Sequence, residues 1–123
     1  GLGMQVGGHC PQVTHGQALA AFYPAFTRYT YPTAIEKFAT VGRILNSELC
    51  GLDNVAAAKQ CCEEIDKFLQ RIGLWIGYSE LGVSMEDIRE ISDCGQVLGD
   101  SLNNPRVATI DEMYELLISC YQR

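Results

Sequence analysis

The sequence predicts an all-α domain, a bundle-like arrangement of about five to six helices. Segments with Ser or Thr followed three residues later by Glu, Gln or Asp recur along the chain, and this pattern caps helix N-termini. Apolar residues after these segments recur at intervals of three and four, which places them on one face of a helix. No stretch shows the apolar–polar alternation of a half-buried strand. We therefore expect one helical domain over residues 1–123.

The first predicted helix covers residues 15–29. Thr14 and Gln17 form its capping box, and its apolar face comprises Ala18, Leu19, Phe22, Tyr23 and Phe26. Pro24 lies inside this stretch, so we expect a kink there or a helix end near Tyr23, because proline lacks the backbone N–H of a helix interior. Tyr31 precedes a second proline and is therefore disfavoured in helical angles, which predicts a break.

Two further helices are predicted in the middle of the chain. Thr33 and Glu36 form a capping box, and the helix that follows has an apolar side made of Ile35, Phe38, Val41, Ile44 and Leu45. Residues 46–51 end it, and Asp53 caps the next helix. That helix carries apolar residues at helical spacing, namely Val55, Ala58, Cys62, Ile65, Leu69 and Ile72. Gly73 ends it as a C′ residue.

The last third of the chain begins with an apolar stretch without a clear period, residues 74–83. Its Gly and Ser residues indicate an extended loop packed on the helices. Ser84 and Asp87 then open a helix whose expected buried side is Met85, Ile88, Ile91, Val97 and Leu98. Residues 103–106 form a turn. Thr109 and Glu112 cap the final helix, which is expected to bury Met113, Leu116, Leu117 and Cys120.

Charge and hydropathy exclude several classes of function. The chain has 15 acidic and 9 basic residues and a net charge of −6, with no cluster of Lys or Arg. This disfavours binding to nucleic acid or to anionic lipid. No apolar run is long enough for a membrane span, and the first residues lack the features of a secretory signal. We therefore expect a cytoplasmic protein with neither a nucleic-acid nor a membrane partner.

Six cysteines are present, but no pair has the C-x-x-C spacing of a zinc ribbon or a thioredoxin-like redox motif. Cys61, Cys94 and Cys120 fall on the expected apolar faces of helices. We expect free, buried, reduced thiols, as is usual in the cytosol.

The chain has only two histidines, His9 and His15, six residues apart. This is not a metal-binding spacing, and a histidine near a helix start is more often structural or merely exposed. His15 lies at or near the first residue of a capped helix, where the positive end of the helix dipole favours neutral imidazole. Neutral imidazole is the form that binds a divalent metal, so the position permits a ligand role without requiring it.

Three collinear segments resemble the iron-containing (group III) alcohol dehydrogenases. Residues 13–20 read VTHGQALA and are followed by Pro24, like the metal-binding segment of that family. Residues 79–83 read SELGV and precede an E-D-I at 86–88, and residues 104–106 read NPR before the last helix. Each segment alone is weak evidence for the resemblance, but together the three segments cover nearly the whole chain. The resemblance implies a dehydroquinate synthase-like C-terminal helical domain.

The resemblance implies that the chain is a fragment. Family members are longer and have an N-terminal nucleotide-binding domain for NAD(P), while the helical domain contributes to a metal site with Fe²⁺, or alternatively Zn²⁺. The metal polarises the oxygen of a small alcohol or aldehyde, and the nicotinamide exchanges hydride with its carbon. On this basis the full-length parent is an iron-dependent alcohol dehydrogenase, and the isolated chain is inactive.

The resemblance also assigns positions in the site. The family's metal is held by one Asp and three His, and His15 matches the last of these. Another metal His falls on Gly1, and a histidine of the substrate pocket falls on Gln5, which cannot act as an acid or base. We expect Gln5 and His9 on the pocket wall, with His9 as a possible substitute ligand. One ligand is too few for a stable site, so the chain should bind metal more weakly than micromolar.

Two alternatives remain open. The first is a relative within the same fold, such as a glycerol dehydrogenase or a dehydroquinate synthase. The second is a freestanding helical interaction module without catalysis, which the departures at Gly1 and Gln5 favour. If the chain is an excised domain, the surface that met the missing domain should be apolar. We therefore expect an exposed patch near residues 1–20 and 74–79, and a possible homo-oligomer.

Overall fold

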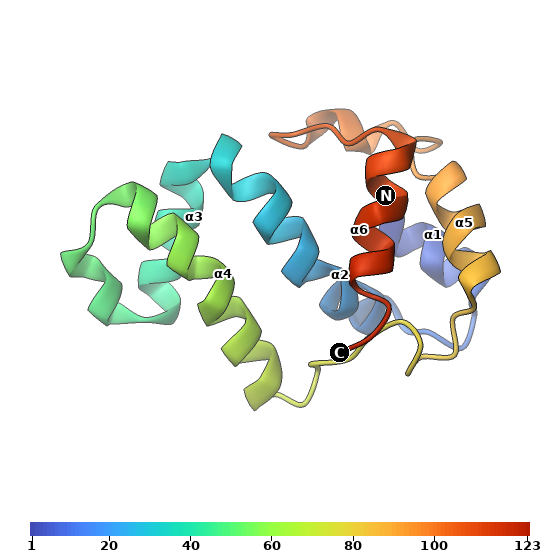
Figure 1. Ribbon diagram of the computed structural model, residues 1–123, viewed down its shortest axis with the longest axis horizontal. Coiled ribbons are helices and arrows are strands. Elements are labelled where there is room, and N and C mark those ends of the chain that lie inside the picture. The colour runs from blue at the N-terminus through green and yellow to red at the C-terminus, as the bar shows by residue number, and fades with distance from the viewer.

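The computed structural model describes residues 1–123 as six α-helices with no strand (Figure 1). The helices are α1 (Leu2–His9), α2 (His15–Thr30), α3 (Ile35–Leu45), α4 (Asn54–Arg71), α5 (Met85–Asp93) and α6 (Ile110–Ser119). Three short 3-10 helices join them: η1 (Tyr31–Thr33), η2 (Ser47–Gly51) and η3 (Asp100–Asn103). The predicted all-α class and the predicted number of helices are confirmed. None of these helices combines the length and the apolar character needed to cross a membrane.

The helices form two groups joined by α2. Figure 1 shows α3 and α4 at one end, α1, α5 and α6 at the other, and α2 between them. The larger core lies in the second group, where Val6, Tyr78, Ile88 and Leu117 are fully buried or nearly so. Two smaller apolar clusters lie along α3 and α4. Ala18 and Ala21 of α2 belong to the larger core, and Ala20 of α2 belongs to one of the smaller clusters. Packing on both sides therefore fixes the position of α2, including its first turn.

Local capping explains where most helices begin. Thr14, Ser84 and Thr109 accept the N3 backbone N–H of α2, α5 and α6 in reciprocal capping boxes, and Asp53 caps α4, all as predicted. The prediction for Thr33 is wrong. Its hydroxyl donates to the Thr30 carbonyl over 2.8 Å, because Thr33 closes the turn η1, and α3 begins after Ala34 without a side-chain cap.

Packing explains two features of α1 and α2. Residues 2–9 form the helix α1, which lies outside the helices predicted from the sequence; burial of Gly3 and Val6 against the rest of the fold outweighs weak helix propensity. Pro24 does not end α2 near Tyr23, since the helix continues to Thr30. Pro24 is itself buried, and α2 packs along α4 as well as α1 and α6, which stabilises the helix across the missing N–H.

The segment between α4 and α5 is the extended loop that the sequence predicts. Tyr78 is buried there and donates its hydroxyl to the Ala18 carbonyl of α2 over 3.1 Å. Its backbone N–H donates to the Cys120 carbonyl, and the Ser79 N–H donates to the Tyr121 carbonyl. The loop thereby ties the end of the chain to α2.

The exposed apolar surface differs in part from the prediction. Met4 and Leu19 are exposed within residues 1–20, as expected, whereas residues 74–79 contain no exposed large apolar side chain. Val97 is 73% exposed and Leu98 is also exposed, although both were predicted to lie on the buried side. The reason is that α5 ends at Asp93, so these residues lie in an irregular segment and no longer share the helical face.

The six cysteines are all free thiols. Cys10, Cys61, Cys62 and Cys120 are buried, whereas Cys50 is exposed and Cys94 is only partly buried. Burial raises the pKa of the Cys61 thiol to about 11, with smaller contributions from Cys62 and Glu64. The expectation of buried, unreactive thiols therefore holds for four of them and fails for Cys50.

Candidate functional site

His15 is the first residue of α2, directly after the cap. The Gln17 N–H donates to Thr14 Oγ1 over 3.4 Å, and the Thr14 N–H donates to Gln17 Oε1 over 3.1 Å. This reciprocal box fixes the backbone of His15 and Gly16, the two residues between the partners. The His15 side chain is exposed. An exposed imidazole on a fixed helix start is available to an incoming ion or partner.

Gly3 of α1 lies against the first turn of α2. A Cβ atom added there would lie 3.0 Å from Leu19 Cδ2 and 3.5 Å from His15 Cε1. A larger residue would therefore push on both side chains. The absence of a side chain at position 3 lets α1 approach α2 closely and sets the place of the His15 ring.

Gln5 and His9 lie one and two turns after Gly1 on α1, and both are half-buried. His9 Nδ1 lies 3.0 Å from the Gln5 carbonyl oxygen, which can only accept, so Nδ1 carries the hydrogen. His9 Nε2 lies 3.9 Å from Glu90 Oε2 of α5. His9 is therefore held between α1 and α5, whereas His15 lies beside Gly3.

The side chains of this chain do not by themselves form a metal site. No three His, Cys, Asp or Glu side chains in residues 1–123 form a group that could hold one. Position 1 is glycine and offers no side chain; a Cβ there would lie 2.8 Å from Asp100 Oδ1. A catalytic metal keeps at least three protein ligands, so His15 can be only part of a site. We therefore derive no metal-dependent step from these residues.

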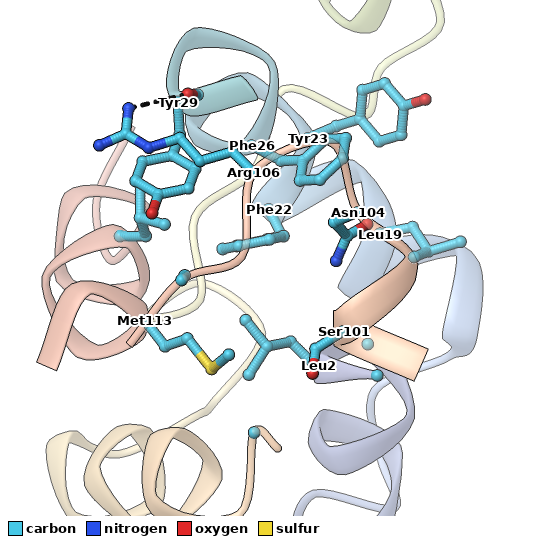
Figure 2. A pocket seen from close by; sticks show the side chains of 15 residues that line it. Leu2, Leu19, Phe22, Tyr23, Phe26, Tyr29, Ser101, Asn104, Arg106 and Met113 are labelled. Atoms are coloured by element: carbon cyan, nitrogen blue, oxygen red, sulfur yellow. Dashed lines mark hydrogen bonds between the residues drawn. The ribbon is translucent and has the colours of Figure 1, made fainter. Parts of the chain in front are cut away.

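A cavity of about 200 Å³ lies along α2 (Figure 2). Gly3 and Leu19 line it, and a Cβ on Gly3 would lie close to both Leu19 and His15 Cε1. Its other walls come from α1, the length of α2, α6 and the irregular segment 95–108. Figure 2 shows Phe22 between Tyr29 on one side and Leu2 and Ser101 on the other, with Met113 opposite. Most of the lining is apolar.

A charged cluster closes one end of the cavity. The Arg106 guanidinium carbon lies 3.7 Å from the centre of the Tyr29 ring, and Arg106 Nη1 donates to the Tyr29 carbonyl over 3.1 Å. Arg106 Nη2 lies 3.5 Å from Glu112 Oε1. Burial, then the neighbouring Glu112 carboxylate, raises the pKa of the Tyr29 hydroxyl. This cluster fastens the segment 104–106 to the end of α2 and the start of α6.

Sequence reasoning missed the cavity, although it named several of its residues. The sequence predicts that Phe22, Tyr23 and Phe26 form a packing face and that residues 103–106 form a turn. The spacing of Phe22, Phe26 and Tyr29 at helical intervals was a visible signal, but it does not distinguish a cavity wall from a core. Apart from α1, the partner walls come from residues 95–116, which no local pattern relates to α2.

Known proteins resemble this chain over nearly its whole length. Residues 1–121 match the family described as Fe-containing alcohol dehydrogenase family, C-terminal. The chain is 28% identical over 113 residues to the NAD-dependent methanol dehydrogenase of Bacillus methanolicus, covering 92% of this chain and 29% of that protein. It is 28% identical over 99 residues to the 1,3-propanediol dehydrogenase of Klebsiella pneumoniae, covering 80% of this chain and 26% of that protein.

A solved structure shares the fold. The crystal structure of a 1,3-propanediol oxidoreductase superposes with a TM-score of 0.89 at 25% identity, covering 98% of this chain and 31% of that one. The chain thus spans about a third or less of the length of the relatives that it matches. On the match over residues 1–121, the chain belongs to the iron-containing alcohol dehydrogenase family and corresponds to its C-terminal helical domain.

Proposed function

We propose that this chain is the C-terminal domain of a metal-dependent alcohol dehydrogenase that transfers hydride between NAD(P) and a small alcohol or aldehyde. The observation that carries the proposal is the family match over residues 1–121. The short coverage of the relatives supports a longer parent with an N-terminal nucleotide-binding domain. The full-length parent is the enzyme, a cytoplasmic protein, and this chain alone is inactive.

His15 is the residue that we assign to the metal. Its exposure at the capped start of α2 leaves the imidazole available, and imidazole suits both Fe²⁺ and Zn²⁺. The other ligands come from outside residues 1–123, because no three His, Cys, Asp or Glu side chains within the chain form a group that could hold a metal ion. When bound, the metal would supply Lewis-acid polarisation of the substrate oxygen. The part that this chain plays is to hold one imidazole in place.

Gln5 and His9 belong to the wall of the substrate pocket in this proposal. Gln5 offers an amide that can donate and accept hydrogen bonds but cannot exchange a proton with substrate. His9 keeps its hydrogen on Nδ1 toward the Gln5 carbonyl, which leaves Nε2 facing Glu90. We place both side chains in the pocket wall rather than at the metal.

The test uses the protein encoded by the complete reading frame that contains this chain. We expect NAD(P)-dependent oxidation of short alcohols by the wild type, and a loss of about a hundredfold or more in kcat/KM for His15→Ala, since a first ligand of the metal is removed. Lys59→Ala, at an exposed position of α4 outside the pocket, is the control and should retain most of the activity. Equal activity of His15→Ala and Lys59→Ala would contradict the assignment of His15.

A specific observation favours the second candidate, a freestanding interaction module. No group of three ligands is present, and glycine and glutamine occupy the two positions that the family resemblance gives to histidine. The upstream reading frame separates the two proposals. A preceding α/β sequence with a Gly-rich phosphate loop and an Asp-x-x-x-His supports the dehydrogenase. A start codon directly before Leu2, with no such sequence upstream, supports the module.

A further inference from the structure

The chain between α5 and α6 forms a loop whose two ends are tied together. Gln96 Nε2 donates to the Ala108 carbonyl over 3.0 Å, which closes a loop of residues 96–108. No backbone hydrogen bond of residues 98–108 leaves this loop. Compact surface loops with closed ends are Ω-loops, and they are frequently functional. Figure 1 shows the loop extending from the α5–α6 end of the molecule toward the end of α2.

Apolar packing contributes little to the position of this loop. Val97 is 73% exposed and Leu102 is 71% exposed, and Leu98 and Val107 are exposed as well. The backbone of η3, which is part of the loop, approaches none of the six α-helices closely. Burial of apolar surface is the usual source of stability for a packed segment. Polar contacts must therefore hold the loop against the rest of the molecule.

Arg106 provides the strongest of these contacts. Its guanidinium stacks on the Tyr29 ring at 3.7 Å, donates to the Tyr29 carbonyl over 3.1 Å and lies 3.5 Å from Glu112 Oε1. The loop has one other ion pair, between the Gly1 amine and Asp100 Oδ2 over 2.8 Å, and the Asp100 side chain is 47% exposed. An exposed ion pair contributes little by itself, whereas Arg106 combines ring stacking with a charge-assisted hydrogen bond. We call the contact between Arg106 and Tyr29 the clasp.

Two buried hydroxyls disfavour the closed position of the loop. Ser101 Oγ on the loop and the hydroxyl of Tyr29 in the clasp are both buried without a hydrogen-bond partner. A buried hydroxyl of this kind loses its bonds to water without replacement. Water would reach both groups if the loop moved away from α2. The clasp thus opposes the cost of the two hydroxyls, and such a balance is expected of a segment that opens locally.

The inner side of the loop covers the cavity along α2. Ser101, Asn104 and Arg106 line this cavity, and so does Met113 of α6, which is 4% exposed. Gly95, directly before the loop, lies so close to Met113 that a Cβ atom at position 95 would collide with the Met113 sulfur. Movement of the loop would therefore uncover the Met113 thioether.

We propose that the loop 96–108 is a flap over the cavity, held closed by the clasp and released as one unit when the clasp opens. The tied ends at Gln96 and Ala108 are its hinge. The flap controls the access of small molecules from solvent to the cavity. It requires neither metal nor cofactor, so it goes beyond the proposed dehydrogenase activity and stands or falls separately from it.

The test measures how fast hydrogen peroxide oxidises each methionine of this chain to the sulfoxide, followed by mass spectrometry of peptides. Met4 and Met85 are 58% and 45% exposed and serve as internal references, whereas Met113 reacts only when the flap opens. Arg106→Ala removes the clasp. We expect Met113 to oxidise about tenfold faster in this variant, the effect of the lost stacking and hydrogen bond, with Met4 and Met85 unchanged.

Two further arginine variants frame this result. Arg106→Lys keeps the charge but not the planar fork, and should accelerate Met113 oxidation less than Arg106→Ala does. Arg71→Ala is the matched control, because Arg71 stacks on the Phe68 ring within α4, outside the flap. The rate of Met113 oxidation in Arg71→Ala should equal that of the wild type.

A change of opposite sign is expected at Ser101. Ser101→Ala removes an unpartnered hydroxyl that disfavours the closed flap, so Met113 should oxidise about threefold more slowly. Thr30→Val removes another buried, unpartnered hydroxyl that does not line the cavity, and should leave the rate unchanged.

Gly42→Ala separates opening of the flap from unfolding of the whole chain. Gly42 lies against α4, where a Cβ would meet Ala57 and Cys61, so this variant loosens the fold away from the flap. We expect its rate of Met113 oxidation to stay near that of the wild type. Equal acceleration in Gly42→Ala and Arg106→Ala would mean that peroxide reaches Met113 only by global unfolding, and would overturn the proposal.

Three other results would also overturn it. The first is an unchanged rate of Met113 oxidation in Arg106→Ala. The second is oxidation of Met113 as fast as that of Met4 in the wild type, which would mean that the loop is not closed. The third is faster oxidation of Met113 in Ser101→Ala, since the unpartnered hydroxyl would then favour the closed position.

Discussion

The two ends of the molecule are built in different ways. The α3–α4 end packs two regular helices through small residues, with Ala39, Ala57 and Ala58 fully buried. At the other end, α1, α5 and α6 enclose the larger core with the help of the loop 74–83 and the segment 95–108. The regular end leaves little space between its helices. The irregular end contains both the larger core and the cavity, and the candidate ligand His15 lies at the start of α2 beside it.

The largest effect is expected where α3 touches α4. A Cβ on Gly42 would lie 2.9 Å from the Ala57 carbonyl oxygen and 3.0 Å from Cys61 Cβ, so Gly42→Ala forces the two helices apart. We expect a loss of about 2 kcal/mol in the free energy of unfolding. Urea denaturation followed by circular dichroism measures it. An unchanged midpoint would mean that the α3–α4 contact is less tight than the structure has it.

The next effect concerns the cap that positions His15. Thr14→Ala removes the acceptor for the Gln17 N–H and should lower stability by about 1 kcal/mol. Thr33→Ala is the matched control, because Thr33 donates only to the Thr30 carbonyl and caps no helix. Thermal unfolding of the two variants compares them directly. A larger loss for Thr33→Ala would contradict the assignment of the two threonines.

A change of opposite sign is expected in α1. Nothing lies within 4 Å of a Cβ added to Gly8, in contrast to Gly42. Gly8→Ala should therefore raise the free energy of unfolding by about 0.5–1 kcal/mol through reduced backbone entropy of the unfolded chain. The same urea experiment measures the gain. Destabilisation by Gly8→Ala would indicate that α1 is not a helix at this position.

The smallest effect is a pH dependence at the start of α5. Hydrogen bonds from the Ser84 hydroxyl and N–H, 2.6 Å and 2.8 Å long, lower the pKa of the Asp87 carboxyl in the folded chain. The stability that this carboxylate contributes is therefore present above its unfolded pKa of about 4 and is lost as the pH falls through the lower folded value. Asp87→Asn should flatten the acid limb of a plot of stability against pH. Identical acid limbs in wild type and variant would exclude this contribution.

Much of the fold could be predicted because its signals are local. The caps at Thr14, Ser84 and Thr109 depend on residues three apart, and the structure has all three. The helix α1 could not be predicted, since its glycine-rich sequence is stabilised by burial of Val6 among residues from distant segments. The exposure of Val97 was missed although the end of α5 has a visible signal, since Gly95 follows the C-cap Cys94 as Gly73 follows the C-cap of α4.

The candidate site could be predicted only where it coincides with a local motif. His15 follows a visible cap, so both its place at a helix start and its resemblance to a metal-binding segment could be inferred. The cavity joins residues such as Phe22 and Ser101 that lie far apart in the sequence. The contact of Arg106 with Tyr29 spans 77 residues. Only the folded arrangement brings these groups together.

The central claim is that His15 is the one metal ligand supplied by this chain. Metal content per subunit tests it most directly, in the protein encoded by the complete reading frame that contains the chain. We predict about one divalent ion per subunit in the wild type and in His9→Ala, and nearly none in His15→Ala, because the remaining ligands bind poorly without the imidazole. An unchanged metal content in His15→Ala, or submicromolar binding of Fe²⁺ or Zn²⁺ by residues 1–123 alone, would contradict the account.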